Sequence, residues 1–330
     1  MSGAVNELRW NPLLREWIIV SSGRERRPWR PKGYCPFCPG AEETGYGWDV
    51  LVLDNKFPAL VREPRTSRRS RGVYRVRGAY GYCKVLVETP QHEGDLCDLS
   101  LSQLVKVIDK FAEVYEELGR DPGVRCVMEF RNKGEAIGVS LTHPHSQIYA
   151  LPFIPTRVRR ELRSARSFAR RRGECLFCHI LKLELKEGVR VVYENEGFVA
   201  FVPFFAMWPL EVHVYPRRHV QSLPQLTGGE RLDLAKCLKV VTYAYNRVFD
   251  QDMPYMMVLH QAPTDGRDYS YYHMHLEFYP ILRDRGKLKY AAGIEWGAGT
   301  FTYDGLPEAN AARLREALAG KLAELVGERE

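Results

Sequence analysis

A short segment, residues 138–147, carries three side chains that could take part in chemistry, at alternate positions. It carries His143, His145 and Gln147 at positions i, i+2 and i+4. Successive side chains of an extended strand point to opposite faces, so these three would project from the same face. A metal ligand, a nucleophile and a hydrogen-bonding amide are therefore predicted to share one small site.

His145 is the candidate nucleophile of this segment. Neutral imidazole attacks phosphorus well and leaves readily, because its pKa lies near neutrality. A backbone carbonyl that accepts a proton from one ring nitrogen would leave the other nitrogen to attack. Gln147 and Ser140 could donate hydrogen bonds to phosphate oxygens as negative charge develops. The alternative for a single histidine is a buried side chain with satisfied hydrogen bonds.

Four residues ahead of and within this segment form a candidate zinc site. Cys35 and Cys38 have the Cys-x-x-Cys spacing, and His92 and His143 complete a Cys2His2 set. Zinc prefers this tetrahedral set, and a site filled by four protein ligands is structural. The alternative is two reduced cysteines in a tight turn and two core histidines.

The second half of the chain repeats the order of the first: a cysteine pair, a histidine, a capped helix, a strand and a His-x-His segment. His92 and His143 are 51 residues apart, and His219 and His273 are 54 residues apart. The repeat predicts a second zinc set, with a disulfide or two free thiols as the alternatives for its cysteine pair. The members of this set are Cys175, Cys178, His219 and His273.

The elements that position these residues follow from hydrophobic periodicity and helix caps. Ser100 and Gln103 predict a capping box before one helix, and Thr227 and Glu230 predict another. Further helices are expected over Thr156–Arg172 and Leu306–Glu330. We expect an α+β fold with two tandem repeats, residues 1–172 and 173–330, that form a mostly antiparallel sheet flanked by helices.

Composition limits the functional classes. The chain has 330 residues, 45% of them hydrophobic, and eight cysteines. It has no apolar run of about 18 residues and no secretory apolar segment, so we expect a cytoplasmic enzyme without membrane association. In such a protein, paired cysteines favour metal binding or redox chemistry over a disulfide framework.

The net charge of +7 is concentrated in two arginine-rich stretches, residues 62–77 and 157–172. These stretches either form a solvated surface or attract an anionic substrate or nucleic acid. The pattern of basic and aromatic residues that is typical of an RNA-binding module does not accompany this charge, so we expect no nucleic-acid partner. A zinc-stabilised RNA-binding protein is kept as a remote alternative.

The segment Gly138-Val-Ser-Leu-Thr-His-Pro-His-Ser-Gln-Ile148 resembles the active-site motif of galactose-1-phosphate uridylyltransferases, in the histidine-triad superfamily. The resemblance extends over nearly the whole chain and implies two histidine-triad-like repeats. Other matching positions are Arg27-Pro-Trp29, Cys35-Pro-Phe-Cys38, Asn55, His92, Asn132-Lys-Gly134, Trp208-Pro209, His219, His260, His275 and Phe278-Tyr-Pro280.

This resemblance implies an activity. Such enzymes exchange a uridylyl group between UDP-glucose and galactose 1-phosphate, through a covalent uridylyl-histidine, and release glucose 1-phosphate and UDP-galactose. The resemblance also implies zinc, a homodimer and a place in galactose metabolism. Related phosphorylases transfer adenylyl groups from ADP-glucose or adenylyl sulfate, and this alternative stays open because no single residue identifies the base.

The resemblance also assigns roles to residues. His145 falls on the nucleophile and Gln147 on its phosphate-binding partner. Cys35, Cys38, His92 and His143 fall on the zinc ligands. Substrate-binding positions are matched by Arg27, Asn55, Asn132, Ser140, Lys289 and Glu295.

Some relatives hold a second metal, often iron, with one glutamate and three histidines. Glu161, His260 and His275 match three of these positions, and Glu277 stands where the third histidine is expected. This set could still bind a divalent ion, iron or zinc. The alternative for Glu161 is an ion pair with Arg157 one helical turn away.

Overall fold

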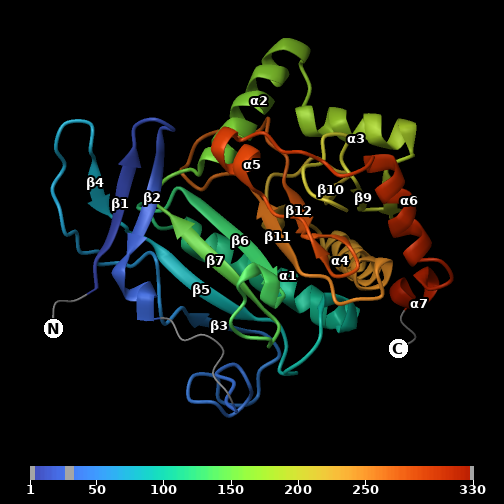
Figure 1. The fold of residues 1–330 in the computed structure, drawn as a ribbon, viewed down its shortest axis with the longest axis horizontal. Helices are drawn as coiled ribbons and strands as arrows, with labels where there is room; N and C mark the ends of the chain where they lie inside the picture. Colours follow the sequence, from blue (N-terminus) through green and yellow to red (C-terminus); the bar gives the residue numbers. More distant parts are fainter. Residues whose placement is uncertain (1–3, 27–32, 328–330) are drawn as a thin grey trace.

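A nine-stranded antiparallel sheet forms the centre of the computed structural model, which describes residues 4–26 and 33–327 (Figure 1). Arg27 lies outside the described residues. The α+β expectation, a mostly antiparallel sheet flanked by helices, is confirmed. In spatial order the strands are β3 (Leu51–Asp54), β5 (Tyr82–Val87), β7 (His145–Leu151), β6 (Cys126–Lys133), β11 (Tyr255–His260), β12 (His275–Pro280), β10 (Val212–Pro216), β9 (Phe198–Phe201) and β8 (Val191–Glu194).

The strand order shows the internal repeat. At the centre β6 pairs with β11, with Phe130 opposite Val258. On one side the order continues β7, β5, β3, and on the other β12, β10, β9. The strands that begin at His145 and His275 therefore occupy equivalent places. The predicted division between residues 172 and 173 falls between α2 (Thr156–Arg172) and α3 (Leu176–Glu187), and it stays a prediction.

Two long helices, α1 (Leu101–Gly119) and α4 (Gly228–Val248), pack against each other and against one face of the sheet. Leu104, Ile108 and Leu238 are among the fully or nearly fully buried side chains of this core. Burying such side chains contributes about 1.5–3 kcal/mol each. This core fixes the register of the strands that carry the candidate chemistry.

The opposite face of the sheet is covered differently in the two halves. Over the second half, α2 and α3 pack on β9 and β10, where Leu162 and Phe177 meet Phe201 and Tyr215 (Figure 1). Over the first half, the loop that carries Phe37 packs on Val85 and Val87 of β5. The first half therefore leaves room beside β7 for a ligand.

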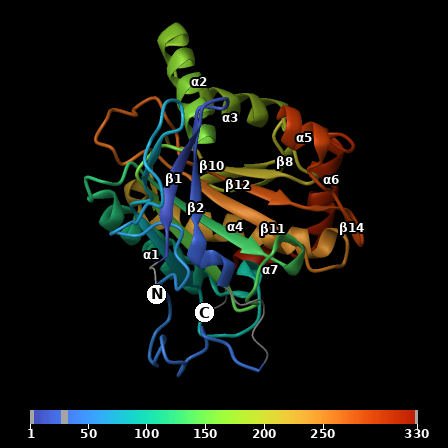
Figure 2. The same cartoon turned by 60° about the vertical axis from the view of Figure 1, so that its left-hand side comes forward.

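The remaining elements lie at the margins of the molecule. The β1–β2 hairpin stands outside the main sheet (Figure 2). In the described ranges no helix has the length and apolar character needed to cross a membrane. These elements are β1 (Asn6–Asn11), β2 (Glu16–Ser21), η1 (Ser22–Arg26), β4 (Val76–Gly78), η2 (Leu96–Asp98), η3 (Glu135–Ile137), η4 (Leu223–Gln225), β13 (Leu282–Asp284), β14 (Lys287–Leu288), α5 (Gly293–Ala298), α6 (Pro307–Ala317) and α7 (Leu322–Val326).

The predicted helix caps are correct at one helix and half correct at the other. Thr227 and Glu230 form a complete capping box on α4. Ser100 caps α1 by accepting from the Gln103 backbone N–H at 3.0 Å. The Gln103 side chain is not the reciprocal cap: it donates to the carbonyls of Asp49 and Glu88, at 2.8 and 2.7 Å.

One helix was not predicted and another was wrong in extent. The sequence analysis expects no helix at the second cysteine pair, but Cys175 is the N-cap of α3. The helix expected over Leu306–Glu330 is interrupted: α6 ends at Ala317, Gly320 adopts a φ of 72°, and α7 begins at Leu322.

The capping box of α4 predicts a pH-dependent contribution to stability. The Arg218 guanidinium donates to the Glu230 carboxylate and lowers its pKa to about 2. A lowered folded-state pKa stabilises the native protein above the ordinary pKa of 4.5, and this contribution is lost as the pH falls toward 2.

We therefore expect Glu230→Gln to lower the free energy of unfolding at pH 7 by about 1–2 kcal/mol, and by much less at pH 3. Urea unfolding at both pH values measures this difference. Glu316→Gln, on the exposed side of α6, is the control. A Glu230→Gln deficit that is equally large at pH 3 contradicts the assignment.

Candidate active site

His145 is the first residue of β7, and its ring is braced by the backbone. Its Nδ1 lies 2.8 Å from the carbonyl oxygen of His143. The Nδ1–H donates to this oxygen, so the lone pair of the neutral ring is on Nε2. The Phe37 ring packs on the imidazole, with centroids 5.2 Å apart. The sequence predicts this contact between a ring nitrogen and a backbone carbonyl.

The alternation of β7 separates its chemistry from its core. Ser146, Ile148 and Ala150 are buried, and Ile148 and Ala150 belong to the core beneath α1 and α4. His145 and Gln147 are half-buried on the other face of the strand. The shared face predicted for these two residues is confirmed. His143 lies two residues before the strand begins, at a bend followed by Pro144.

A cleft of about 420 Å³ opens beside His145. Asn132 lines it, as do the charged side chains of Arg131, Lys133 and Glu135. A cleft of this volume is in the range that holds small molecules. Ser140 lies apart from it, in an adjoining hollow lined by Cys35, Cys38 and His92.

Three other predicted substrate-binding residues lie outside this cleft. Asn55 follows β3, and its Oδ1 accepts from the Phe57 N–H at 2.9 Å. Lys289 and Glu295 share one partner: Lys289 donates to the Thr302 carbonyl at 2.5 Å, and the Thr302 hydroxyl donates to Glu295 at 2.7 Å. Within this chain, Lys289 and Glu295 therefore form a cluster of their own.

A buried ion network lies directly behind His145. The guanidinium of Arg131 donates to Glu88 and to Asp95, each at 3.0 Å, and to the Tyr255 hydroxyl at 2.8 Å. Burial would raise the pKa of Asp95, but Arg131 and Lys133 hold it below its ordinary value. Asp95 is therefore ionised in the interior.

This network reaches the strand that begins at His145. The Ser146 hydroxyl donates to Glu88 at 2.6 Å, and the Glu88 N–H donates to the Pro144 carbonyl at 3.1 Å. Ser146 follows His145 and Pro144 precedes it, so the network fixes the backbone on both sides of His145.

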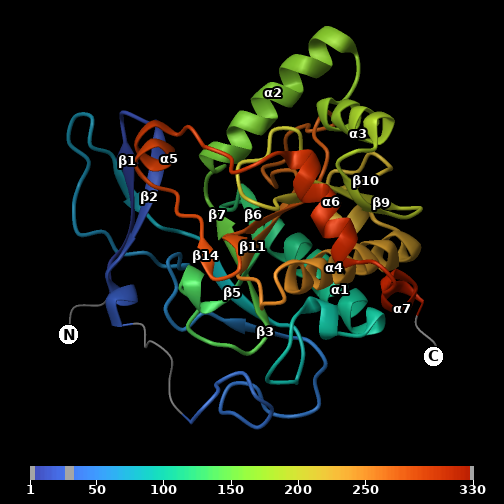
Figure 3. The ribbon, with the colours of Figure 1, turned by 45° about the vertical axis from the view of Figure 1, so that its right-hand side comes forward.

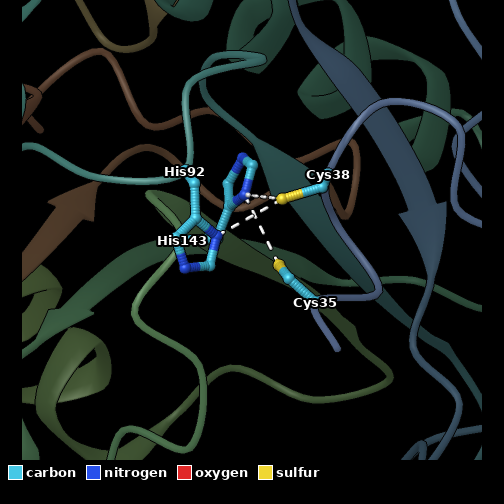
Figure 4. A group of neighbouring side chains, drawn as sticks. All are labelled: Cys35, Cys38, His92 and His143. Carbon is cyan, nitrogen blue, oxygen red and sulfur yellow. Dashed lines mark hydrogen bonds between the residues drawn. The ribbon is translucent and has the colours of Figure 1, made fainter. Parts of the chain in front are cut away.

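The first predicted zinc set is brought together at the N-terminal knuckle (Figure 4). The ligand atoms of Cys35, Cys38, His92 and His143 lie within 4.8 Å of one another. Cys38 Sγ is 3.3 Å from His92 Nδ1 and 3.7 Å from His143 Nδ1. Sulfur and nitrogen bound to one tetrahedral zinc ion are about 3.6 Å apart, so the donors fit this ion.

The orientation of His143 also suits a metal ligand. Its Nε2–H donates to the Thr89 carbonyl at 2.8 Å, which directs Nδ1 toward the sulfur atoms. Metal-binding histidines generally have such a second partner. Burial lowers the pKa of His143, which favours the neutral ring that binds metal.

The acidic set Glu161, His260, His275 and Glu277 is also assembled, with ligand atoms within 4.8 Å of one another. Glu161 lies 3.0 Å from His260 Nδ1, and Glu277 lies 3.3 Å from His260 Nε2. Burial would raise the pKa of Glu161, but His260 lowers it. Ionised carboxylates together with neutral imidazole rings are suitable ligands for a divalent metal. The alternative ion pair of Arg157 with Glu161 is present too, at 3.4 Å.

The sequence analysis missed two members of this buried cluster. His213 Nε2 lies 2.9 Å from Glu211 and 3.5 Å from Glu277, and His213 is almost fully buried. The only available signal was the alternation Glu211-Val-His213-Val-Tyr215, which places these polar side chains on one face of β10.

The second cysteine–histidine set is brought together as well. The ligand atoms of Cys175, Cys178, His219 and His273 lie within 4.8 Å of one another. Both cysteines are free, so the disulfide alternative does not describe this structure. The acidic set and this set, offered by the sequence as alternatives, exist side by side in the same chain. Among residues 4–26 and 33–327, three groups of side chains could therefore hold a metal ion.

Two family models match the chain in succession. The galactose-1-phosphate uridyl transferase N-terminal domain matches residues 2–155, and the C-terminal domain of the same family matches residues 161–325. The galactose-1-phosphate uridylyltransferase of Thermotoga maritima is 40% identical and aligns over 94% of this chain and 98% of that protein. The rat enzyme of the same name is 36% identical over 93% and 86%.

Solved structures agree with these matches. A uridylyltransferase structure is 48% identical, with a TM-score of 0.88, and covers 94% of this chain and 98% of that chain. An ADP-glucose phosphorylase from Arabidopsis thaliana, solved with bound ADP-glucose, is 26% identical, with a TM-score of 0.75, over 94% and 99%.

The network behind His145 predicts a stability cost. Arg131→Met would leave Glu88 and Asp95 buried without their main counter-charge, so we expect the free energy of unfolding to fall by about 3–5 kcal/mol. Urea unfolding measures it. The matched control is Arg231→Met, which removes the more exposed pair with Asp109 and should cost at most about 1 kcal/mol. Equal losses in the two variants would refute a special role for Arg131.

Proposed function

Because the chain belongs to the galactose-1-phosphate uridylyltransferase family, whose members are nucleotidyltransferases, we propose that His145 carries the uridylyl group between UDP-glucose and galactose 1-phosphate. One observation supports this role above all. The Nδ1–H of His145 donates to the His143 carbonyl, which leaves Nε2 as the attacking nitrogen.

In the first half-reaction, Nε2 attacks the α-phosphorus of UDP-glucose. A nitrogen–phosphorus bond forms, the bond from this phosphorus to the bridging oxygen breaks, and glucose 1-phosphate leaves with the electron pair. The ring then carries positive charge, which the His143 carbonyl stabilises through Nδ1–H. In the second half-reaction, a phosphate oxygen of galactose 1-phosphate attacks the same phosphorus. The nitrogen–phosphorus bond breaks, and UDP-galactose forms.

Other residues would bind the substrates. Gln147 lies on the same face of β7 as His145, and Asn132 lines the cleft, so their amides would donate to phosphate oxygens. Ser140 and Arg27 are assigned to the phosphates and Asn55 to the nucleotide. Lys289 and Glu295 are assigned to the hexose phosphate. These five assignments rest on the family resemblance.

We assign zinc to Cys35, Cys38, His92 and His143, and a divalent ion, iron or zinc, to Glu161, His260, His275 and Glu277. With four protein ligands the first ion would be structural, holding the knuckle against the backbone that braces His145. Zinc-binding thiols must stay reduced, which favours a cytoplasmic location.

A second candidate keeps the chemistry and changes the base. The likeness to the ADP-glucose phosphorylase favours testing adenylyl transfer from ADP-glucose, with adenylyl sulfate as the other donor in this class. A zinc-stabilised RNA-binding protein would have no use for the braced ring of His145, so that alternative is weaker.

Intact-mass analysis after incubation with UDP-glucose tests the central proposal. The unmodified chain should gain one uridylyl group, and His145→Ala should gain none and lose about 10⁴-fold or more in exchange rate. His179→Ala, a partly exposed histidine on α3, is the control and should be modified normally. A uridylyl adduct on His145→Ala would contradict the proposal, and an adduct formed only from ADP-glucose would favour the adenylyl alternative.

We also propose that the protein is a homodimer. Tyr290, Ile294 and Trp296 are large exposed apolar residues on and beside α5, which lies outside the main sheet (Figure 3). Trp296 is 81% exposed. Large exposed aromatic side chains are enriched at protein interfaces, so we assign the interface to this region.

Trp296→Lys should convert the dimer to a monomer, because a charge would replace the largest apolar side chain of this surface. Light scattering coupled to size exclusion measures the mass. The control is Leu13→Lys, at the exposed turn between β1 and β2, which should leave the mass unchanged. A monomeric unmodified chain, or a dimeric Trp296→Lys variant, would argue against this interface.

A further inference from the structure

The cluster of Cys175, Cys178, His219 and His273 has no part in the proposed chemistry, yet its donors converge on one point. Cys178 Sγ lies 3.3 Å from His219 Nδ1 and 3.3 Å from His273 Nδ1. Sulfur and nitrogen bound to one tetrahedral zinc ion are about 3.6 Å apart. All four ligand atoms lie within 4.8 Å of one another, as in the knuckle at Cys35.

The donors come from three separate segments. The two cysteines lie at the start of α3, His219 follows β10, and His273 precedes β12. The His219 Nε2–H donates to the Ser270 carbonyl at 2.9 Å, which directs its Nδ1 toward Cys178. The Met274 N–H donates to the Val220 carbonyl at 2.8 Å, so the residues that follow the two histidines are joined.

The internal repeat supplies independent support. Cys175, Cys178, His219 and His273 follow the same order as the first set and approach equivalent strands, β10 and β12 instead of β5 and β7. The residue two places after each buried histidine is braced in the same way: His145 Nδ1 lies 2.8 Å from the His143 carbonyl, and His275 Nδ1 lies 3.1 Å from the His273 carbonyl.

We propose that Cys175, Cys178, His219 and His273 hold a zinc ion of their own, distinct from the ion assigned to Cys35, Cys38, His92 and His143. Two thiolates and two imidazoles fill the tetrahedral shell, so the site is structural. It ties the start of α3 to the segments that lead out of β10 and into β12. The proposal rests on these ligand atoms alone, so it can hold or fail independently of uridylyl transfer by His145.

Zinc content of the purified, fully reduced chain gives the first test. Cys178→Ser should lose one equivalent of zinc relative to the unmodified chain, Cys38→Ser should lose one, and the double variant should lose two. The control is His179→Ala, next to Cys178 but paired with Glu174 at 2.8 Å, and it should keep the full content. Unchanged zinc content in Cys178→Ser would overturn the proposal.

Cobalt substitution gives a readout that excludes the acidic set. Thiolate-bound Co²⁺ has an intense sulfur-to-metal charge-transfer band, and Glu161, His260, His275 and Glu277 contain no sulfur. Two equivalent sites contribute equally to the intensity of this band. Cys178→Ser and Cys38→Ser should therefore each show about half of the band intensity of the unmodified chain. A band abolished by Cys38→Ser alone, or a Cys175–Cys178 disulfide found by mass in protein isolated without oxidant, would overturn the proposal.

His219→Ala tests the same site without changing a cysteine, in case a cysteine variant misfolds. His219 is exposed, so its replacement should leave the fold intact. This variant should release one zinc equivalent to a chromogenic chelator at least about tenfold faster than the unmodified chain. His179→Ala should release zinc at the unmodified rate. Equal release from His219→Ala and the unmodified chain would count against a ligand role for His219.

Discussion

A buried guanidinium, that of Arg131, holds together the part of the molecule on which the chemistry depends. It is surrounded by Glu88, Asp95 and Tyr255, and its side chain is only 2% exposed. Such a charge is tolerated in the interior only when it is paired and hydrogen-bonded on all sides. Tyr255 belongs to the second half of the sheet, so the network also crosses the seam between β6 and β11. The backbone that flanks His145 is therefore held by a network to which both halves contribute.

The two halves use one scaffold for different purposes. His145 and His275 begin equivalent strands, and each donates Nδ1–H to the carbonyl two residues earlier. Two residues further on, the first strand has Gln147 and the second has Glu277. His275 is 1% exposed and packs on Phe177, with centroids 4.9 Å apart. His145 therefore lies beside an open cleft with an amide as its neighbour on the strand, whereas His275 lies in a closed interior beside a carboxylate, which makes it a metal-ligand candidate.

Short-range pattern predicted much of this structure. The metal sets were found because Cys-x-x-Cys and His-x-His spacing can be read directly, and the repeat then matched distant partners. What failed depended on tertiary contacts. Gln103 leaves its own helix end because its amide donates to the carbonyl of the buried residue Glu88 and to that of the exposed residue Asp49. The helix α3 was not predicted because its cysteine pair repeats the pattern of the first pair, although Phe177 and Leu181 have helical spacing. His213 was missed because its role depends on Glu277, 64 positions away in the sequence.

The antiparallel seam separates two of the three candidate metal sets from the cleft beside His145. Since β6 and β11 run antiparallel, and β7 and β12 each run antiparallel to their neighbour, the strands at His145 and His275 start at opposite ends of the sheet. The acidic set and the second Cys2His2 set therefore lie at the end remote from the His145 cleft. Each cysteine–histidine set closes a long loop, as between Cys38 and His143 or between Cys178 and His273. Loop-closure entropy grows only slowly with length, so one ion at each end can hold such distant segments together. The cleft at the His145 end is lined instead by the amide of Asn132 and by Lys133, whose ammonium group pairs with Asp95 and Asp252.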